Sequence, residues 1–255
     1  MKNIDQWKPT KYVQRRGCLS GSRDPAQVHL SSRLITDRVA KAYEEILPTH
    51  ACGDLLDLGC GQVPLYSAYE ANVKSVTCVD WPGSPHDVGH ADILCDVNEP
   101  LPIESDLFDT VICSDVLEHL HSPSVTLAEI SRVLRPGGKL ILSVPFMYGL
   151  HEQPHDYHRY TRFAIENWCE LHGLQSVQIQ EVGGAGDVLC NVIAKLLSRI
   201  PIIGGLMSRV VQAAWSLLRS IGPIRRADQK TSGQFPIEYM AVLQKPNALT
   251  DANDG

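Results

Sequence analysis

The 255-residue chain lacks several features that mark special classes of protein. Its eight cysteines form no C-x-x-C pair, which disfavours a structural zinc site, and several stand in apolar runs, as is typical of reduced thiols. No uncharged apolar stretch approaches the ~20 residues that a membrane-spanning helix needs. Residues 1–7 show no signal-peptide pattern. We therefore expect the chain to stay in the cytoplasm.

Composition and charge exclude further classes. With 44% hydrophobic and 20% charged residues, the chain has the composition of a globular protein rather than of a disordered or collagen-like one. A net charge of −6 at pH 7 disfavours a large nucleic-acid-binding surface, because the phosphate backbone attracts basic proteins. We expect no nucleic-acid partner, and the length suits one large α/β domain.

Short β-rich apolar runs alternate with helical patterns from about residue 53 to residue 144. This alternation is typical of βαβ units and of a parallel sheet that helices cover on both faces. We predict strands over residues 54–58, 75–80, 91–95, 109–113, 139–144, 175–182 and 237–243. Helices are predicted over 32–47, from 122 to the Pro136-Gly137-Gly138 stop, and over 161–171.

Segments outside this alternation define the domain organisation. Residues 1–30 are polar, contain proline and glycine, and are expected to run over the surface. Residues 31–245 are predicted to form the α/β domain, with an apolar and basic helical insertion, 186–227, before the last strand. Residues 246–255 are expected to form a flexible tail.

The first predicted strand runs into a glycine loop, Asp57-Leu58-Gly59-Cys60-Gly61. Glycines after a parallel strand allow the backbone to approach a ligand closely. A dinucleotide would place its pyrophosphate here, but an ionised Asp57 repels an anion and favours a cationic group such as an ammonium. The loop therefore favours a cationic ligand over a dinucleotide.

Two further acids follow the next two strands. Asp80 ends the second strand, where a carboxylate can accept hydrogen bonds from both ribose hydroxyls. Asp96 follows the third strand, where it can meet the edge of an adenine. Each acid taken singly could equally cap a helix or contact solvent. Three acids at successive strand ends outline one ligand with an amino group, a ribose and a base.

Four stretches together resemble the class I S-adenosylmethionine-dependent methyltransferases, in the broad small-molecule group that includes ubiquinone- and menaquinone-pathway enzymes: LDLGCG at 56–61, Asp80, FDTVICSDVLEH at 108–119 and RVLRPGG at 132–138. The resemblance covers about residues 55–173, with an echo at 238–245. It implies an α/β fold with a Rossmann-like, seven-stranded, mostly parallel sheet and a reversed last strand. It also implies S-adenosylmethionine as cofactor, held by Asp57, Gly59, Cys60, Gly61, Asp80, Trp81, Asp96, Val97 and Ser114.

The loop departs from this family at Val63, where relatives usually carry a third glycine. We expect that a β-branched residue excludes a positive φ there and narrows the space above the loop. Two alternatives to a methyltransferase stay open: an adaptor of this fold that binds no cofactor and uses the insertion to hold a partner, and a nicotinamide-dependent Rossmann oxidoreductase. Asp57 and the absent glycine count against the oxidoreductase.

The loop after the fifth strand, residues 145–162, carries the candidate catalytic residues. Methyl transfer from a sulfonium needs an aligned acceptor, and a hydroxyl acceptor also needs a base, for which histidine suits neutral pH. We predict His155 or His151 as base, Asp156 as the residue that orients an imidazole, and Arg159 as partner of an anionic acceptor. The alternative is a structural clamp of Asp156, Tyr157 and Arg159. A similar run in methyltransferases encoded near polysaccharide and lipid-sugar pathways implies a small-molecule, glycan or lipid-linked acceptor.

Asp115, Glu118 and His119 show a D-x-x-E-H spacing that resembles the metal-binding pattern of some quinone-pathway and small-RNA methyltransferases. The same Leu-Glu-His triplet occurs in relatives that bind no metal. We therefore expect no metal here, and we expect His119 and His121 on the surface.

The segment 188–223 is strongly apolar, and residues 188–227 contain no Asp or Glu but six cationic residues. Two amphipathic helices are predicted, on either side of a break at Ile203-Gly204-Gly205. Such a segment suits contact with the inner membrane surface, or a lid over an apolar acceptor. The alternative is a helical hairpin that packs on the protein's own core or in a dimer. The sequence leaves the oligomeric state open.

Overall fold

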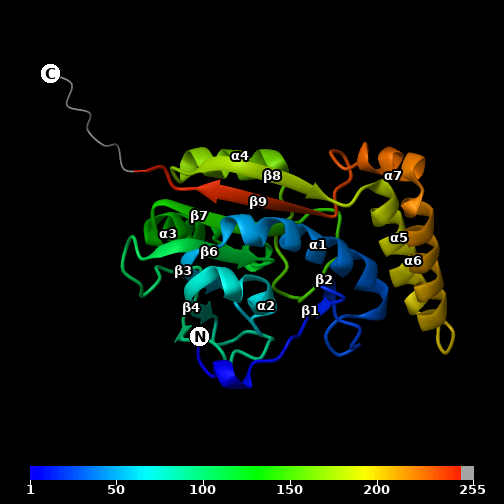
Figure 1. Ribbon diagram of the computed structural model, residues 1–255, viewed down its shortest axis with the longest axis horizontal. Helices are drawn as coiled ribbons and strands as arrows, with labels where there is room; N and C mark the ends of the chain where they lie inside the picture. The colour runs from blue at the N-terminus through cyan, green and yellow to red at the C-terminus, as the bar shows by residue number, and fades with distance from the viewer. Residues whose placement is uncertain (248–255) are drawn as a thin grey trace.

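Seven strands form one sheet in the computed structural model, which describes residues 1–247 (Figure 1). Their order is β5-β4-β3-β6-β7-β9-β8, and every pairing is parallel except the two made by β9, which runs against both of its neighbours. This confirms the mostly parallel sheet with a reversed last strand. The strands are β3 (Gly53–Leu58), β4 (Val73–Asp80), β5 (Ile93–Leu94), β6 (Phe108–Ser114), β7 (Leu134–Pro145), β8 (Gln175–Val182) and β9 (Glu238–Gln244).

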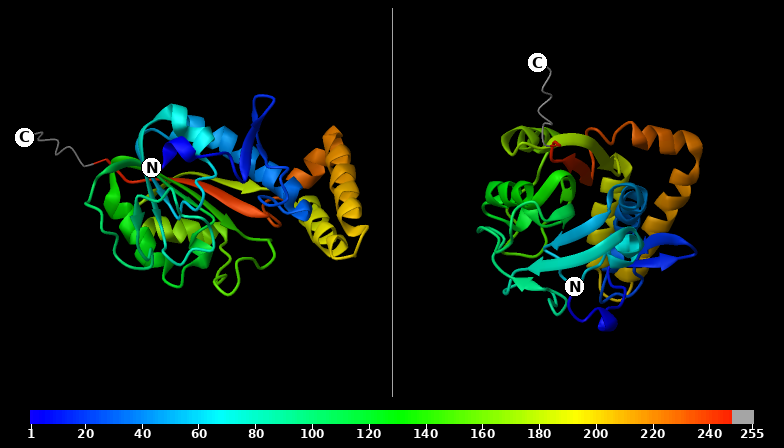
Figure 2. Two further views of the ribbon diagram at one scale, coloured as in Figure 1. Left: turned by 90° about the horizontal axis from the view of Figure 1, so that it is seen from below. Right: turned by 60° about the vertical axis from the view of Figure 1, so that its left-hand side comes forward.

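Helices cover both faces of this sheet (Figure 2). One face carries α3 (Pro123–Val133) and α4 (Arg162–Leu171), and the other carries α1 (Arg33–His50) and α2 (Tyr66–Tyr69). Three further helices lie beyond one end of the sheet in Figure 1: α5 (Ala185–Ser198), α6 (Gly204–Ser220) and α7 (Gly222–Gln229). Short 3-10 turns are η1 (Ile4–Gln6), η2 (Leu30–Ser32), η3 (Glu70–Asn72) and η4 (Leu117–His119).

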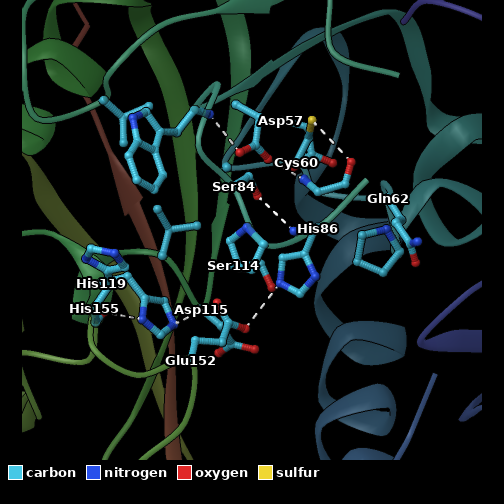
Figure 3. A pocket seen from close by; sticks show the side chains of 18 of the residues that line it. Asp57, Cys60, Gln62, Ser84, His86, Ser114, Asp115, His119, Glu152 and His155 are labelled. Carbon is cyan, nitrogen blue, oxygen red and sulfur yellow. Dashed lines mark hydrogen bonds and ion pairs between the residues drawn. The ribbon is translucent and has the colours of Figure 1, made fainter. Parts of the chain in front are cut away.

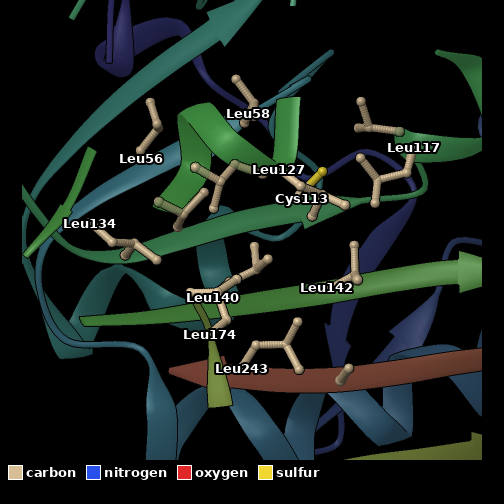
Figure 4. Close-up of a cluster of buried hydrophobic side chains, with 14 of the residues drawn as sticks. Leu56, Leu58, Cys113, Leu117, Leu127, Leu134, Leu140, Leu142, Leu174 and Leu243 are labelled. Carbon is tan, nitrogen blue, oxygen red and sulfur yellow. The ribbon is translucent and has the colours of Figure 1, made fainter. Parts of the chain in front are cut away.

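Each central strand contributes to two hydrophobic cores, because successive residues of a strand point to opposite faces. In β3, Leu56 and Leu58 join the core under α3 and α4, whereas Leu55 joins the core under α1. Figure 4 shows Leu127 of α3 next to Cys113 of β6 in the first of these cores. A sheet that is buried on both faces is a rigid support for the loops at its edge.

The ends of the elements follow local chemistry. Pro123 occupies the first turn of α3, where a missing N–H costs nothing. The hydroxyl of Thr161 accepts a hydrogen bond from the Ala164 N–H and caps α4. The strand predicted to begin at residue 139 begins at Leu134 instead. Its first residues continue through the Pro-Gly-Gly turn, where Gly137 adopts a positive φ and its N–H donates to Lys245 after β9.

Residues 1–30 are more than the surface segment that the sequence predicted. They contain an antiparallel hairpin of β1 (Tyr12–Arg15) and β2 (Cys18–Gly21). Tyr12 is fully buried and its ring packs edge-on against Tyr43 of α1, while Leu19 is buried against the same helix. A polar composition concealed these anchors, because the apolar residues occur only as two short pairs, at 12–13 and 18–19, among polar ones. The segment therefore packs against the α/β domain.

The insertion forms α5 and α6, which pack side by side, followed by α7. The division into two helices agrees with the prediction, but the break lies at residues 199–203 and not at Ile203-Gly204-Gly205, because α6 already begins at Gly204. Within residues 1–247, no helix combines the length and the apolar character needed to cross a membrane. The predicted tail, 246–255, lies outside the described residues except for its first two.

Candidate active site

A cavity of about 590 Å³ lies at the carboxyl ends of β3, β4 and β6. Parallel strands end at the same edge of a sheet, so residues that are far apart in the sequence meet there. In Figure 3, Asp57 and Cys60 lie toward one end of this cavity and His119, His155 and Glu152 toward the other. All nine residues predicted to hold the cofactor line it: Asp57, Gly59, Cys60, Gly61, Asp80, Trp81, Asp96, Val97 and Ser114.

The glycine loop is fixed to the neighbouring strand. The N–H groups of Gly59 and Cys60 donate to the carbonyl of Val79 in β4, at 2.9 and 3.1 Å. Gly59 has φ +73°, and a Cβ atom there would lie 2.4 Å from a methyl group of Val116. Only glycine fits this position, so the loop keeps an open floor above the end of β3.

Val63 corrects one sequence prediction. Its φ is +51°, so a β-branched residue does adopt the left-handed conformation here. Its side chain is fully buried in the core under α1 and does not line the cavity. The N–H of Val63 donates to Cys60 at 2.7 Å, and its carbonyl accepts from the indole of Trp7 at 3.2 Å. Burial and these hydrogen bonds offset the strain, and the space above the loop stays free.

Asp57 is buried at the base of the cavity, with 5% of its surface exposed. The hydroxyl of Tyr69 donates to its carboxyl group at 2.9 Å. Burial raises the pKa of Asp57 to about 7; the Tyr69 hydrogen bond lowers the pKa, and the charge of Asp80 raises it. A cation placed beside this carboxyl group would favour its ionised form, so the electrostatics suit an ammonium group.

Asp80 and Asp96 are held by backbone and amide donors. One oxygen of Asp80 accepts from the Gly61 N–H and the other from the Trp81 N–H, so Asp80 ties the glycine loop to the end of β4. Asp96 accepts from the backbone and side-chain N–H groups of Asn98, both at 2.9 Å. Their fixed carboxyl groups can accept further hydrogen bonds from a ligand in the cavity.

The two predicted bases occupy different environments. The imidazole of His155 lines the large cavity, meets the ring of Trp81 edge-on and forms a hydrogen bond of 3.0 Å with the Tyr157 hydroxyl. His151 lines a second, smaller cavity of about 140 Å³. Asp156 accepts the backbone N–H of His151 at 2.9 Å and lies 3.4 Å from its Nδ1. Asp156 is therefore placed to orient His151, not His155.

Arg159 lines neither cavity. Its guanidinium makes a two-pronged ion pair with the buried Asp156 and donates to the carbonyls of Tyr148 and His158. This ion pair holds the pKa of Asp156 down at about 2. With these contacts, Arg159 locks the loop 148–159 in place. The prediction that it partners an anionic acceptor is corrected, and the geometry favours the structural clamp.

Glu118 and His119 lie beside His151, and the sequence analysis did not predict this proximity. Glu118 is fully buried with neither carboxyl oxygen hydrogen-bonded within the described chain, and it lies 3.6 Å from Nε2 of His151. His119 is 15% exposed rather than on the surface, and its Nδ1–H donates to the carbonyl of His155 at 2.7 Å. The D-x-x-E-H spacing was the available signal, but only the folded loop brings His151 to it.

Glu118, His119 and His151 offer ligand atoms that all lie within 4.8 Å of one another. One carboxylate and two imidazoles are a donor set that suits a divalent transition metal. Asp115, the first residue of the spacing, is not part of this group, because it pairs with Lys11 at 3.0 Å. The same cluster can hold a proton instead of a metal.

Protonation in this cluster depends on mutual contacts. Burial raises the pKa of Glu118, and His151 opposes that shift. Burial lowers the pKa of His151, but the neighbouring carboxyl groups of Glu118 and Asp156 outweigh it, so the pKa of His151 is raised. An imidazole between two carboxyl groups is well suited to accept a proton and to keep it.

The smaller cavity adjoins the large one, since Lys11, Asp115 and Glu152 line both. Lys11 comes from the N-terminal segment, which the sequence placed on the surface. Glu238 of β9 also lines the smaller cavity, and burial raises the pKa of its carboxyl group well above the ordinary value. The walls of this cavity are therefore largely ionisable.

Comparison with known proteins finds similarity to methyltransferases. Residues 56–142 match the family model described as a methyltransferase domain. The ubiquinone biosynthesis O-methyltransferase of Actinobacillus pleuropneumoniae serotype 7 is 25% identical over 242 residues, which cover 77% of this chain and all of that protein. The ubiquinone biosynthesis O-methyltransferase of Coxiella burnetii is 28% identical over 49% of this chain, and the match spans 64% of its length, somewhat less than two thirds.

Solved structures share the fold at low identity. Geranyl diphosphate methyltransferase in complex with S-adenosylmethionine matches with a TM-score of 0.52 and 16% identity, over 88% of this chain and 93% of that one. An S-adenosylmethionine-dependent methyltransferase from Mesorhizobium loti matches with a TM-score of 0.52 and 15% identity, over 83% and 99%. The [4+2]-cyclase SpnF has a TM-score of 0.56 and 16% identity, over 94% and 87%. These likenesses show the architecture alone.

Proposed function

We propose that the chain is a class I S-adenosylmethionine-dependent methyltransferase that transfers the methyl group to a hydroxyl oxygen of an acceptor bound in the smaller cavity. Bound S-adenosylmethionine supplies an electrophilic methyl group on a sulfonium. The protein's tasks are then to hold the acceptor in line with that methyl group, to exclude water and to accept the hydroxyl proton.

The large cavity has the groups that the cofactor requires. The loop can pack this closely against Val116 only because residue 59 is glycine, since a Cβ atom there would strike Val116. The carboxyl group of Asp57 is buried at the base of the cavity, and we assign it to the ammonium group, whose positive charge would stabilise the ionised form. Asp80 would receive the ribose hydroxyls and Asp96 the adenine edge. Trp81 and Val97, which also line the cavity, offer apolar contact to the adenine ring.

His151 is our choice for the base. It lines the smaller cavity, and its two ring nitrogens lie 3.4 Å from Asp156 and 3.6 Å from Glu118. Its raised pKa favours proton uptake, and the two carboxyl groups stabilise the imidazolium that results. His155 is the second candidate, because it lines the large cavity directly, but its Nδ1 meets a tyrosine hydroxyl rather than a carboxylate.

Oxygen is the acceptor atom best supported by the relatives, which are named as O-methyltransferases. A hydroxyl group needs a base, and the ionisable walls of the smaller cavity provide several. We extend the proposal to a small-molecule, glycan or lipid-linked acceptor and to a cytoplasmic location. All eight cysteines are free thiols, which is compatible with a reducing compartment.

The observation that carries the proposal is the shared wall between the two cavities. Three side chains line both, so a methyl donor in the large cavity and an acceptor beside His151 would be neighbours. Proximity of this kind is the main contribution of a protein to an in-line displacement.

The test combines a product screen with two histidine variants. Extract fractions are incubated with the protein and methyl-labelled S-adenosylmethionine, and mass spectrometry identifies the labelled product and the methylated atom. For His151→Ala we expect turnover to fall by about 10²-fold or more with unchanged cofactor affinity, and for the matched variant His155→Ala a smaller loss. A large loss on His155→Ala alone would assign the base to His155. Calorimetric binding of a nicotinamide cofactor but not of S-adenosylmethionine would contradict the proposal.

A further inference from the structure

The hairpin of α5 and α6 is inverted relative to an ordinary surface helix pair. Its inward face combines polar side chains with small residues: the buried residues are Asp187, Cys190, Asn191, Ala194, Gly204, Ser208 and Gln212. Its outward face is apolar: Leu189, Val192, Leu196, Leu206, Val210 and Leu217 are each more than half exposed. A contiguous apolar surface of this kind on a soluble protein marks a contact site.

Hydrogen bonds fix this orientation. The side-chain carbonyl of Gln212 accepts from the Leu34 N–H at 2.9 Å, and its amide donates to the carbonyl of Leu30 at 2.8 Å. About one turn further along α6, the indole N–H of Trp215 donates to Asp187 of α5 at 2.7 Å. Hydrogen bonds therefore hold the polar face against the rest of the protein, and the apolar face remains exposed to solvent.

The tip of the hairpin is the most exposed apolar part. Ile202 is fully exposed and adopts φ +66°, a conformation that is costly for a β-branched residue. Ile200, Ile203 and Leu206 beside it are also exposed. No charged residue lies between Arg199 and Arg209, so an apolar tip is bracketed by two arginines.

The exposed charges of this region have one sign. Residues 185–230 contain two acids, and both are buried: Asp228 pairs with Arg219 at 2.7 Å, and Asp187 lies 3.4 Å from Arg38. The exposed charged side chains are all cations: Arg199, Arg209, Arg225, Arg226 and Lys230. They stand out in a chain whose net charge is −6.

We propose that this hairpin docks on an anionic lipid surface, with the tip among the acyl chains near the headgroups and the arginines at the phosphates. A second copy of the chain fits less well. A symmetric contact through this patch would bring like charges together, and the patch exposes no acid to balance them.

Docking would bring the active site to the membrane. The hairpin lies beyond the end of the sheet at which the parallel strands finish (Figure 1), and residues at that same edge line the large cavity. Lys195 of α5 places its ammonium 3.6 Å from the ring centre of Tyr148, and Tyr148 lines the smaller cavity and packs edge-on against His151. Resting on the proposed function, this juxtaposition points to an acceptor that carries its hydroxyl group on a membrane-borne molecule.

The test is co-sedimentation of the full chain with vesicles of phosphatidylcholine alone or mixed with phosphatidylglycerol. We expect binding to the mixed vesicles that weakens as salt is added. Ile202→Asp with Leu206→Asp should lose about tenfold or more in vesicle affinity. Arg199→Gln with Arg209→Gln should lose roughly fivefold for each arginine. Arg219 is unsuitable because it holds a buried acid.

Controls separate docking from misfolding and from the enzyme assignment. Phe163→Asp removes a similarly exposed apolar side chain on α4 and should bind vesicles like the parent chain. Calorimetry with S-adenosylmethionine in the absence of vesicles tests the proposed function separately from docking. Unchanged cofactor binding by a variant also shows that the variant is folded. A chain that binds the cofactor but no vesicles refutes docking alone, and the reverse result refutes the function alone. Equal vesicle binding by the tip variant, or a dimer in solution that the tip variant abolishes, also overturns the docking proposal.

Discussion

Acidification should weaken the binding of S-adenosylmethionine through one carboxyl group, that of Asp57. Burial raises the pKa of Asp57 to about 7, so in the free protein this group takes up a proton as the pH falls below neutrality. The amino group of the ligand is already cationic below about pH 8. The attraction between ammonium and carboxylate is then lost because Asp57 becomes protonated, while the charge of the ligand does not change.

The magnitude follows from the ionised fraction. One unit below a pKa of about 7, roughly one tenth of the protein carries the carboxylate. If the ammonium binds only that form, the observed dissociation constant rises about tenfold per pH unit below 7 and is nearly constant above it. Binding at low pH should also release close to one proton per ligand, because the ligand drives Asp57 back to its ionised form.

The contribution of Asp57 to the stability of the free protein changes with pH in the opposite direction to cofactor affinity. The pKa of Asp57 in the folded state lies above its ordinary value of 3.8, so the folded chain holds this proton more tightly than the unfolded chain. The contribution of this group to stability is therefore complete below about pH 4 and is lost as the pH rises through about 7. Cofactor affinity and the stability contribution of this one group should move in opposite directions.

The assay is isothermal titration calorimetry with S-adenosylhomocysteine, which keeps the ammonium and is the reaction product. Measurements at several pH values, in two buffers of different ionisation enthalpy, give the affinity and the protons released. Asp57→Asn is the matched control, because an amide oxygen can still accept from Tyr69 but cannot ionise. It should bind weakly with no pH slope. A flat profile in the parent chain, or the same slope in Asp57→Asn, would refute the reasoning.

Two further predictions concern stability. Gly59→Ala should lower the free energy of unfolding by about 2 kcal/mol, because it adds a clash with Val116 to a positive φ; thermal unfolding of Gly17→Ala, with a positive φ but no atom within 4 Å, should show a smaller loss. Asp156→Asn should cost about 2 kcal/mol in a urea titration, because it removes the charge that pairs with the partly buried guanidinium of Arg159. Asp106→Asn, in an exposed pair, should cost under about 1 kcal/mol in the same measurement. Equal losses within either pair of variants would contradict these assignments.

The strands and the acidic residues that line the large cavity were predictable from the sequence because their signals are local. The leucines of 54–58 need burial on both faces of a sheet wherever the strand lies, and Asp57, Asp80 and Asp96 each stand at or near the end of a strand. Once the runs form a parallel sheet, their ends share one edge. The proximity of these side chains therefore follows from the sheet alone, whatever conformation the loops adopt.

The loop residues were predicted less well, because contacts between loops depend on how they pack. Nothing in the order of residues shows that Asp156 orients His151 instead of His155, or that Arg159 is fully engaged within its own loop. The position of Lys11 was missed for the same reason, since a polar segment gives no sign that its tyrosine anchors it beside a cavity. The strain at Val63 is likewise a tertiary outcome, because the surrounding core holds it in place.

The amphipathic insertion shows most clearly which features the sequence determines and which ones only the tertiary structure decides. By itself, the sequence determined that residues 188–218 form two helices, each with an apolar face and with cations beside it. Periodicity says which residues share a face, but both orientations of a helix satisfy the same period. Only the tertiary structure decided that the polar face turns inward, because Gln212 and Asp187 find their hydrogen-bond partners there and leave the leucines and isoleucines to the outside.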